Sequence, residues 1–148
     1  MGAIRYIKPQ TVKDLERQND EAKRLKFPNF PYPVASSFRD DTANGLTQCI
    51  VRFIELKGYQ AERISNTGRH IRNGSTYQWV YGTGTKGTAD ISATIKGRSC
   101  KIEVKIGRDR QSEAQKDYQN KIESSGGIYF IAKDFTSFLE WFNKTFEA

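Results

Sequence analysis

The sequence contains no long apolar run. Its apolar clusters are all far shorter than the roughly 20 residues that a helix needs to cross a bilayer. Its opening stretch, MGAIRYIKPQ, lacks the apolar segment of a secretory signal. These absences predict a cytoplasmic protein with no membrane partner, and a length of 148 residues is typical of one domain.

Cysteine and histidine are also scarce. Cys49 and Cys100 do not form a closely spaced pair, and His70 is the only histidine. This pattern provides neither a disulfide framework nor the ligand set of a zinc site. We expect each cysteine to pack as a small apolar side chain.

Acidic residues are scarce in one part of the chain. The formal net charge is +7, and residues 52–110 hold 12 Lys and Arg against 5 Asp and Glu, while the remainder holds 12 of each. A one-sided positive charge attracts polyanions such as nucleic acids. The same excess also serves solubility, so composition leaves both interpretations open.

The periodicity of the apolar residues predicts a mixed α/β domain with a central sheet. Helices are expected over residues 11–26, 42–58, 112–125 and 136–146, and strands over residues 59–65, 76–82, 88–95, 101–106 and 128–132. Residues 66–75 are expected to form a polar, basic loop. The predicted core order is a helix, a three-strand antiparallel meander, a helix, a strand and a helix.

Residues 1–38 are expected to form an N-terminal arm, followed by the domain over residues 39–148. Three of the four prolines lie in the run FPNFPYPV, where they prevent helix formation and favour extended chain. Phe27, Phe30 and Tyr32 are the expected anchors of the arm, either on the domain or on a second subunit.

Charged residues interrupt the run GTADISATIKGRSCKIEVK, whose two halves alternate as strands do. A two-residue turn at Gly97 and Arg98 would place Asp90 opposite Lys105. Opposed residues share a face, so Asp90, Glu103 and Lys105 would project from one side of the sheet. The two acids would then be diagonal neighbours, with Cα atoms roughly 7–8 Å apart.

Two carboxylates so close together repel each other unless something compensates. A hard cation such as Mg²⁺ or Mn²⁺ compensates, since it prefers oxygen ligands, and it can acidify water and neutralise phosphate charge. Lys105 would then orient the water or stabilise developing negative charge. The alternative is an exposed polar face on which Asp90 and Lys105 form a cross-strand ion pair.

The order of these residues resembles the signature of the PD-(D/E)XK nuclease superfamily. The matching segments are GTAD at 87–90, IEVK at 102–105 and SEAQ at 112–115, before a helix, a double glycine and an apolar strand. Over about residues 42–133 the sequence is similar to the VRR-NUC branch and to archaeal-type Holliday junction resolvases. The resemblance implies a restriction-endonuclease-like core and a Mg²⁺- or Mn²⁺-dependent endonuclease.

The resemblance also implies a role for each matching residue. Asp90, Glu103 and the backbone carbonyl of Val104 would bind the metal. Lys105 would be the catalytic lysine, and Gln115 would lie near the metal or the phosphate. Gln115 also fits a helix capping box, and both roles can hold together.

The first core helix departs from the family pattern. The family carries a glutamate there, whereas this region has no acid. Asn44 or Gln48 would substitute as a neutral oxygen donor, and Asp40 and Asp41 lie just before the helix. Ala89 also replaces the proline that precedes the aspartate in the family. The missing acid motivates a second hypothesis, a catalytically weakened nucleic-acid-binding protein on the same fold.

Basic residues flank the expected site and form a candidate phosphate track. They are Arg63, Arg69, Arg72, Lys86, Lys101, Arg108 and Arg110. For each of them singly, the alternative is an ordinary solvated surface position. Trp79 and Tyr81 would stack on a base, or else belong to the core or to a dimer interface.

Together these features predict an endonuclease that is selective for branched, flapped or junction DNA, because no base-reading motif is visible. A homodimer would suit a two-fold symmetric junction. A phage or mobile-element setting is consistent with a short nuclease of this type. A third hypothesis is a protein-interaction module built on the proline-aromatic arm.

Overall fold

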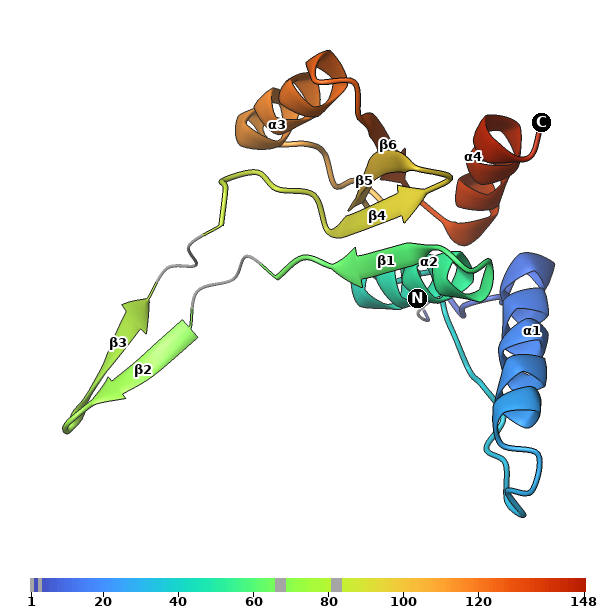
Figure 1. The fold of residues 1–148 in the computed structure, drawn as a ribbon. Helices are drawn as coiled ribbons and strands as arrows, with labels where there is room; N and C mark the ends of the chain where they lie inside the picture. The colour runs from blue at the N-terminus through green and yellow to red at the C-terminus, as the bar shows by residue number, and fades with distance from the viewer. Residues whose placement is uncertain (1, 3, 66–68, 81–83) are drawn as a thin grey trace.

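The computed structural model describes residues 2, 4–65, 69–80 and 84–148 (Figure 1). The helices are α1 (Gln10–Lys26), α2 (Ala43–Leu56), α3 (Glu113–Ser124) and α4 (Phe135–Phe146). The strands are β1 (Gln60–Arg63), β2 (Arg69–Asn73), β3 (Thr76–Val80), β4 (Ile91–Ile95), β5 (Arg98–Val104) and β6 (Ile128–Ala132). The predicted mixed α/β class is confirmed, and none of the helices described is both long and apolar enough to cross a membrane.

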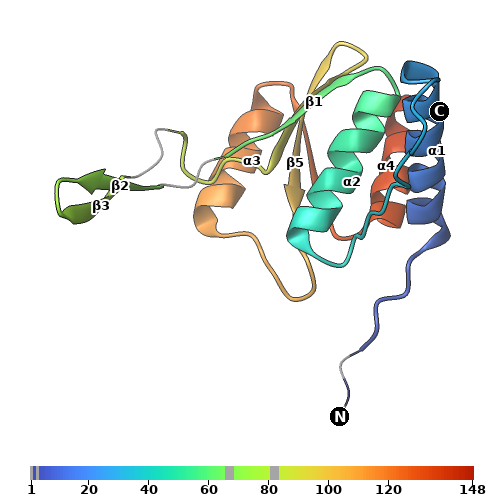
Figure 2. The same ribbon diagram turned by 90° about the horizontal axis from the view of Figure 1, so that it is seen from below.

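The central sheet has the strand order β1–β4–β5–β6. β1, β4 and β5 form an antiparallel meander, and β6 pairs parallel to β5. α2 and α4 cover one face of the sheet with α1 outside them, whereas α3 lies on the opposite side (Figure 2). The core therefore runs in the predicted order, with one insertion.

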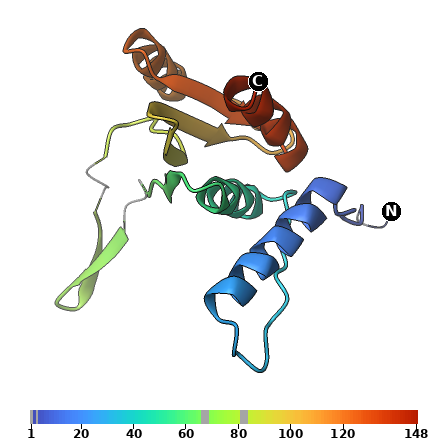
Figure 3. The same cartoon turned by 45° about the vertical axis from the view of Figure 1, so that its right-hand side comes forward.

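The insertion is a separate hairpin of β2 and β3 between two strands that are neighbours in the sheet. It stands away from the central sheet (Figures 1 and 3). The loop predicted over residues 66–75 is therefore wrong over Arg69–Asn73, where β2 forms, and residues 66–68 lie outside the described residues. The strand predicted over 76–82 is confirmed as β3 over Thr76–Val80, although it pairs with β2 and not with the meander; Tyr81 and residue 82 lie outside the described residues. The cause is a two-residue turn at Gly74 and Ser75, where Gly74 has a φ of +68°, as a tight hairpin requires.

The hydrophobic core lies between the sheet and the helices α2 and α4. Phe53 of α2 meets three phenylalanines of α4 edge-on, with ring centroids 5.0–5.9 Å apart. The core-facing side chains of β4 and β5 are Ile91, Ala93, Ile95, Cys100, Ile102 and Val104. The alternation predicted for these strands is confirmed, so their polar side chains face α3.

Both cysteines pack as apolar side chains, as predicted. Cys49 and Cys100 are free thiols and fully buried. Burial raises the pKa of Cys49 to about 12 and that of Cys100 to about 11. Neither thiol is therefore a nucleophile at neutral pH.

The N-terminal arm packs on the domain through α1. Val12 and Leu15 are buried in the same core as α2 and α4. Phe27, Phe30 and Tyr32 are instead 59%, 61% and 81% exposed. The expectation that these aromatics anchor the arm on the domain is therefore wrong, because the short apolar stripe of α1 does so. Their contact with a second subunit stays a prediction.

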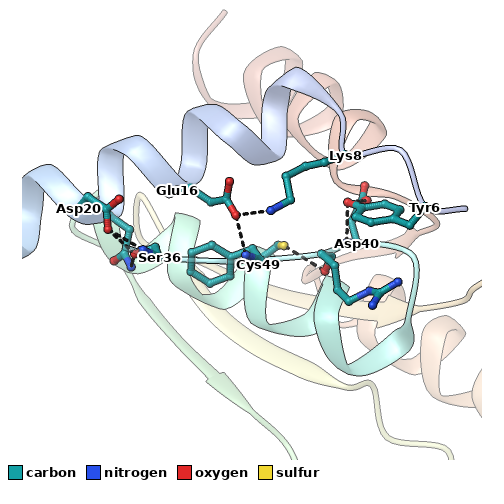
Figure 4. A network of polar contacts seen from close by, with 10 residues as sticks. Tyr6, Lys8, Glu16, Asp20, Ser36, Asp40 and Cys49 are labelled. Carbon is teal, nitrogen blue, oxygen red and sulfur yellow. Dashed lines mark hydrogen bonds and ion pairs between the residues drawn. The ribbon is translucent and has the colours of Figure 1, made fainter. Parts of the chain in front are cut away.

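Buried or half-buried acids fasten the segment before α2 (Figure 4). Glu16 of α1 accepts a hydrogen bond from the Phe38 backbone N–H at 2.8 Å. Asp40 accepts one from the Tyr6 hydroxyl at 2.7 Å and, on its other oxygen, one from the Phe135 backbone N–H at 3.0 Å. Asp40 is thus a structural acid that joins the arm to the start of α4.

Gly87 fixes the approach of the chain to β4. Its φ is +80°, and a Cβ there would lie 2.3 Å from the backbone oxygen of Ala114 in α3. Gly97, in the turn between β4 and β5, has a φ of +77°, yet a Cβ there would meet nothing within 4 Å. The two glycines share the conformational requirement and differ in the contact with α3.

We expect Gly87→Ala to lower the free energy of unfolding by about 3 kcal/mol or more, since it adds a backbone clash to the strain of a positive φ. The matched Gly97→Ala change should cost only about 1 kcal/mol, from strain alone. Urea unfolding measures both. Equal losses would contradict the close packing of residue 87 on α3.

Candidate functional site

The turn between β4 and β5 sets the register of the site. It is formed by Lys96 and Gly97, with φ values of +50° and +77°, as in a type I′ turn, and it pairs Ile95 with Arg98. The turn predicted at Gly97 and Arg98 is therefore wrong, and the pairing moves by two residues. A shift of two leaves every side chain on its predicted face.

This register, continued by one pair, places Asp90 opposite Glu103 rather than opposite Lys105. Directly opposed Cα atoms lie roughly 4.5–5.5 Å apart, closer than the diagonal spacing expected from the sequence. Asp90 is fixed there by two hydrogen bonds. Its Oδ2 accepts from the Val104 N–H at 2.8 Å, and its backbone carbonyl accepts from the Ile64 N–H at 2.7 Å.

Glu103 is the buried centre of the group formed with Asp90, Lys105 and Gln115, here named the acid cluster. Only 3% of Glu103 is exposed, so the alternative of an exposed polar face is wrong for this residue. Its Oε1 accepts a hydrogen bond from Gln115 Nε2 at 2.9 Å and lies 3.6 Å from Lys105 Nζ. Its Oε2 is buried, and no described residue donates to it. A buried carboxylate oxygen in this state requires a proton or a cation.

The pKa of Glu103 follows from these surroundings. Burial raises it to about 8, and the charge of Asp90 adds to the rise, while Lys105 opposes it. At neutral pH the metal-free protein therefore holds a proton on Glu103. A cation that binds the two acids must displace that proton.

Gln115 joins Glu103 to the start of α3. Ser112 Oγ accepts from the Gln115 N–H at 3.2 Å, and Gln115 Oε1 accepts from the Ser112 N–H at 2.9 Å. The predicted capping box is confirmed. Because the cap occupies the amide oxygen, the amide nitrogen is directed to Glu103, so one side chain both caps α3 and holds the acid.

Two tyrosines that sequence reasoning missed lie close to Glu103. Tyr118 of α3 and Tyr129 of β6 have ring centroids 6.3 Å apart. Burial raises the pKa of both, that of Tyr129 to about 12, and the charge of Glu103 adds to both shifts. The position of Tyr129 depends on β6 lying beside β5, which pairs Lys101 with Tyr129. No local pattern in the sequence reports that pairing.

Basic side chains line a hollow of about 260 Å³ beside Lys105, here named the basic hollow. Four cations and one acid face it, which suits an anionic phosphate group. The lining residues are Lys105, Asp109, Arg110, Gln111, Lys116, Ile131 and Lys133. Arg108 lines an adjoining hollow with Arg110 and Lys133. Sequence reasoning missed Lys116 and Lys133, which reach the site only because α3 and β6 flank the end of β5.

The other predicted basic residues lie outside this hollow. Lys101 is on the polar face of β5, where its Nζ donates to Ser92 Oγ at 2.7 Å. Arg69 and Arg72 lie on β2, and Lys86 is exposed on the segment that leads to β4. Of the predicted phosphate track, the structure thus gathers Arg108 and Arg110 beside the acid cluster.

The start of α2 contributes amides rather than acids. Asn44 Oδ1 accepts a hydrogen bond from Arg63, and Gln48 is exposed. Asp41 pairs with its neighbour Arg39, and Asp40 is committed to the arm and α4. Within the described ranges, no group of three or more His, Cys, Asp and Glu gathers. The role of Asn44 or Gln48 as a substitute ligand stays a prediction.

The donors of the acid cluster fit a hard divalent cation. Mg²⁺ in proteins commonly uses one or two carboxylates and keeps several waters, which matches the pair of Asp90 and Glu103. The donor-free Oε2 of Glu103 is the atom that such an ion would satisfy. The described part of the cluster contains neither His nor Cys, the ligands that zinc prefers. Val104 already uses its N–H for Asp90, and its carbonyl stays a predicted ligand.

Glu103→Gln should change how stability depends on pH. The pKa of Glu103 is about 8 in the folded protein against an ordinary value of 4.5. Its contribution to stability is therefore fully present below about pH 4.5 and is lost as the pH rises through about 8. The glutamine stays neutral, so without metal the variant should gain stability relative to the parent between pH 5 and pH 9.

Urea unfolding in EDTA across that range measures the difference. Glu140→Gln, at an exposed position of α4, is the matched control and should show no such trend. A difference between Glu103→Gln and the parent that is the same at every pH would contradict the raised pKa.

Comparison with known proteins adds no assignment to this geometry. The chain matches no protein-family model and shows no significant similarity to a curated protein. The function must therefore be inferred from the acid cluster, the basic hollow and the distribution of charge.

Proposed function

We propose that this protein is a Mg²⁺- or Mn²⁺-dependent DNA endonuclease with a restriction-endonuclease-like core, similar to the PD-(D/E)XK superfamily. The observation that carries the proposal is the buried, donor-free Oε2 of Glu103 beside a second carboxylate. The ion pair with Lys105 and the hydrogen bond from Gln115 both use Oε1, so Oε2 is left for a proton or a cation. A cation site beside a lysine and a basic hollow would support phosphodiester hydrolysis, because a bound cation can acidify water and neutralise phosphate charge.

Each residue of the acid cluster has a distinct part in this proposal. Asp90 and Glu103 hold the cation, which supplies acidified water and neutralises phosphate charge. Gln115 fixes the orientation of the Glu103 carboxylate through its hydrogen bond. Lys105 faces both Glu103 and the basic hollow, so it can orient the attacking water or stabilise charge on the phosphate.

The basic hollow is the proposed position of the substrate phosphate. Its side chains would contact the phosphate backbone rather than base edges, so they would select no particular sequence. This favours branched, flapped or junction DNA as substrate over a short specific site. A homodimer would place two such sites on a symmetric junction.

Asp90→Asn should reduce Mg²⁺- or Mn²⁺-dependent cleavage by about 100-fold or more, because it removes one of the two charged ligands. Cleavage of labelled junction, flap, single-stranded and duplex DNA measures this. Asp117→Asn makes the same charge change at an exposed position of α3 and should cut like the parent. If Asp90→Asn cuts as well as the parent, the assignment is wrong.

A non-catalytic nucleic-acid-binding protein is the second candidate. The observation that favours it is the start of α2, where Asn44 is engaged by Arg63 and no described carboxylate reaches the acid pair. Calorimetric titration with Mg²⁺ and Mn²⁺ separates the two candidates. Salt-sensitive DNA binding without metal binding would support the second candidate and overturn the first.

The basic hollow should contribute to DNA affinity through charge. Arg110→Ala combined with Lys133→Ala should weaken binding and reduce the slope of log K against log salt by about 2, since roughly one counterion is released per phosphate contact. Lys144→Ala, in the last turn of α4, is the control. Fluorescence anisotropy at several salt concentrations measures the slopes. An unchanged slope in the double variant would show that DNA does not enter this hollow.

A further inference from the structure

We propose that the β2–β3 hairpin is a stacking arm that binds unpaired bases of a nucleic acid beside the acid cluster. The face that would do so consists of His70, Arg72, Tyr77 and Trp79, here named the stacking face. The inference rests on the proposed function, because it places the bound bases next to a cleavage site. It adds that the substrate contains an unpaired strand, which the acid cluster alone does not specify.

The hairpin departs from the same end of the sheet that carries the acids. It is inserted between β1 and β4, which pair directly, so the central sheet is complete without it. Arg63, the last residue of β1, pairs with Ile91, and the next N–H along, that of Ile64, donates to Asp90. A strand bound along the hairpin would therefore lead to the acid cluster.

The two faces of the hairpin differ in composition. Opposed residues share a face, and the register pairs His70 with Trp79 and Arg72 with Tyr77. The ring centroids of His70 and Trp79 are 4.9 Å apart, and Tyr77 and Trp79 are 70% and 43% exposed. Three rings and a guanidinium thus lie on one side of a ribbon. The other face carries Ile71, Asn73, Thr76, Gln78 and Val80.

Charge identifies the class of partner. Residues 63–89 contain no Asp or Glu, and they include Arg63, Arg69, Arg72 and Lys86. A second copy of the hairpin would bring the same positive charges to this surface, so the two hairpins would repel each other. A polyanion is the complementary partner. Aromatic rings interleaved with cations are the usual surface for single-stranded nucleic acid, because every base has a face that can stack.

The spacing of the two larger rings also fits a strand of bases. Tyr77 and Trp79 are two residues apart on one face, which corresponds to about 6.6 Å along the strand. That distance is close to two base-stacking steps of about 3.4 Å. Paired bases are already stacked inside a duplex, so these rings would reach the bases of an unpaired segment.

Binding of a fluorescein-labelled oligodeoxythymidine, followed by anisotropy in EDTA with the full chain, tests the proposal. Tyr77→Ala combined with Trp79→Ala should weaken binding about tenfold or more. The salt slope should not change, because no cation is removed. Ile71→Ala combined with Val80→Ala alters the opposite face of the same hairpin and should stay within about twofold of the parent. Tyr77→Phe with Trp79→Phe keeps the rings and should restore binding.

Three results would overturn the stacking arm. The first is an equal loss of DNA affinity in the two alanine double variants, and the second is no recovery of affinity in the phenylalanine double variant. The third is unchanged DNA binding in the Tyr77 and Trp79 alanine variant together with a loss of self-association in ultracentrifugation, which would make the hairpin a contact between copies.

The proposed nuclease is tested separately. If the parent binds through the stacking face but does not cut, the arm stands and the nuclease fails. If the parent cuts forked DNA and the Tyr77 and Trp79 double variant binds and cuts equally well, only the arm fails.

Discussion

The opposition of Asp90 and Glu103 at the end of the β4–β5 ladder is the constraint on which the candidate site depends. Glu103 is buried beside a second carboxyl group, so its ionised form is disfavoured unless a charge compensates it. The protein compensates in part, through Lys105 and Gln115 on one oxygen of Glu103, and leaves its other oxygen without a described donor. Buried ionic groups seldom add stability compared with apolar side chains of similar size. A bound ligand therefore explains the pair of Asp90 and Glu103 better than a structural role does.

The helix that covers this pair is lightly held. No residue of α3 is fully buried. Its position relies on the capping box, on the close contact of Gly87 with its first turn, and on the hydrogen bond from Gln115 to Glu103. The segment that leads into Asp90 and the helix that supports Glu103 thus touch at Gly87. A change at Gly87 would therefore disturb both the segment that leads into Asp90 and the helix that carries Gln115.

Sequence patterns predicted the features that depend on local periodicity. They missed the features that depend on turn geometry and on pairing between distant segments. Alternation placed Glu103 and Asp90 on one face, because a shift of two residues does not change a face. The register itself was fixed by the backbone of Lys96 and Gly97, which the apolar pattern does not report. The Gly74 turn made a hairpin from an expected loop. Tyr129 and Lys133 joined the site through the parallel pairing of β6, a contact between segments far apart in the sequence.

If the protein binds both a cation and a nucleic acid, as proposed above, the arrangement of charge implies that the two would bind cooperatively. No acid occurs in the sequence from residue 63 to residue 89, and Asp90 comes directly after this segment. Lys105, which lines the basic hollow, lies 3.6 Å from Glu103. A polyanion bound beside these cations would lie close to two carboxyl groups, which repel it unless they carry a proton or share a cation. A bound cation removes that repulsion, and by linkage a bound polyanion raises the affinity for the cation by the same factor.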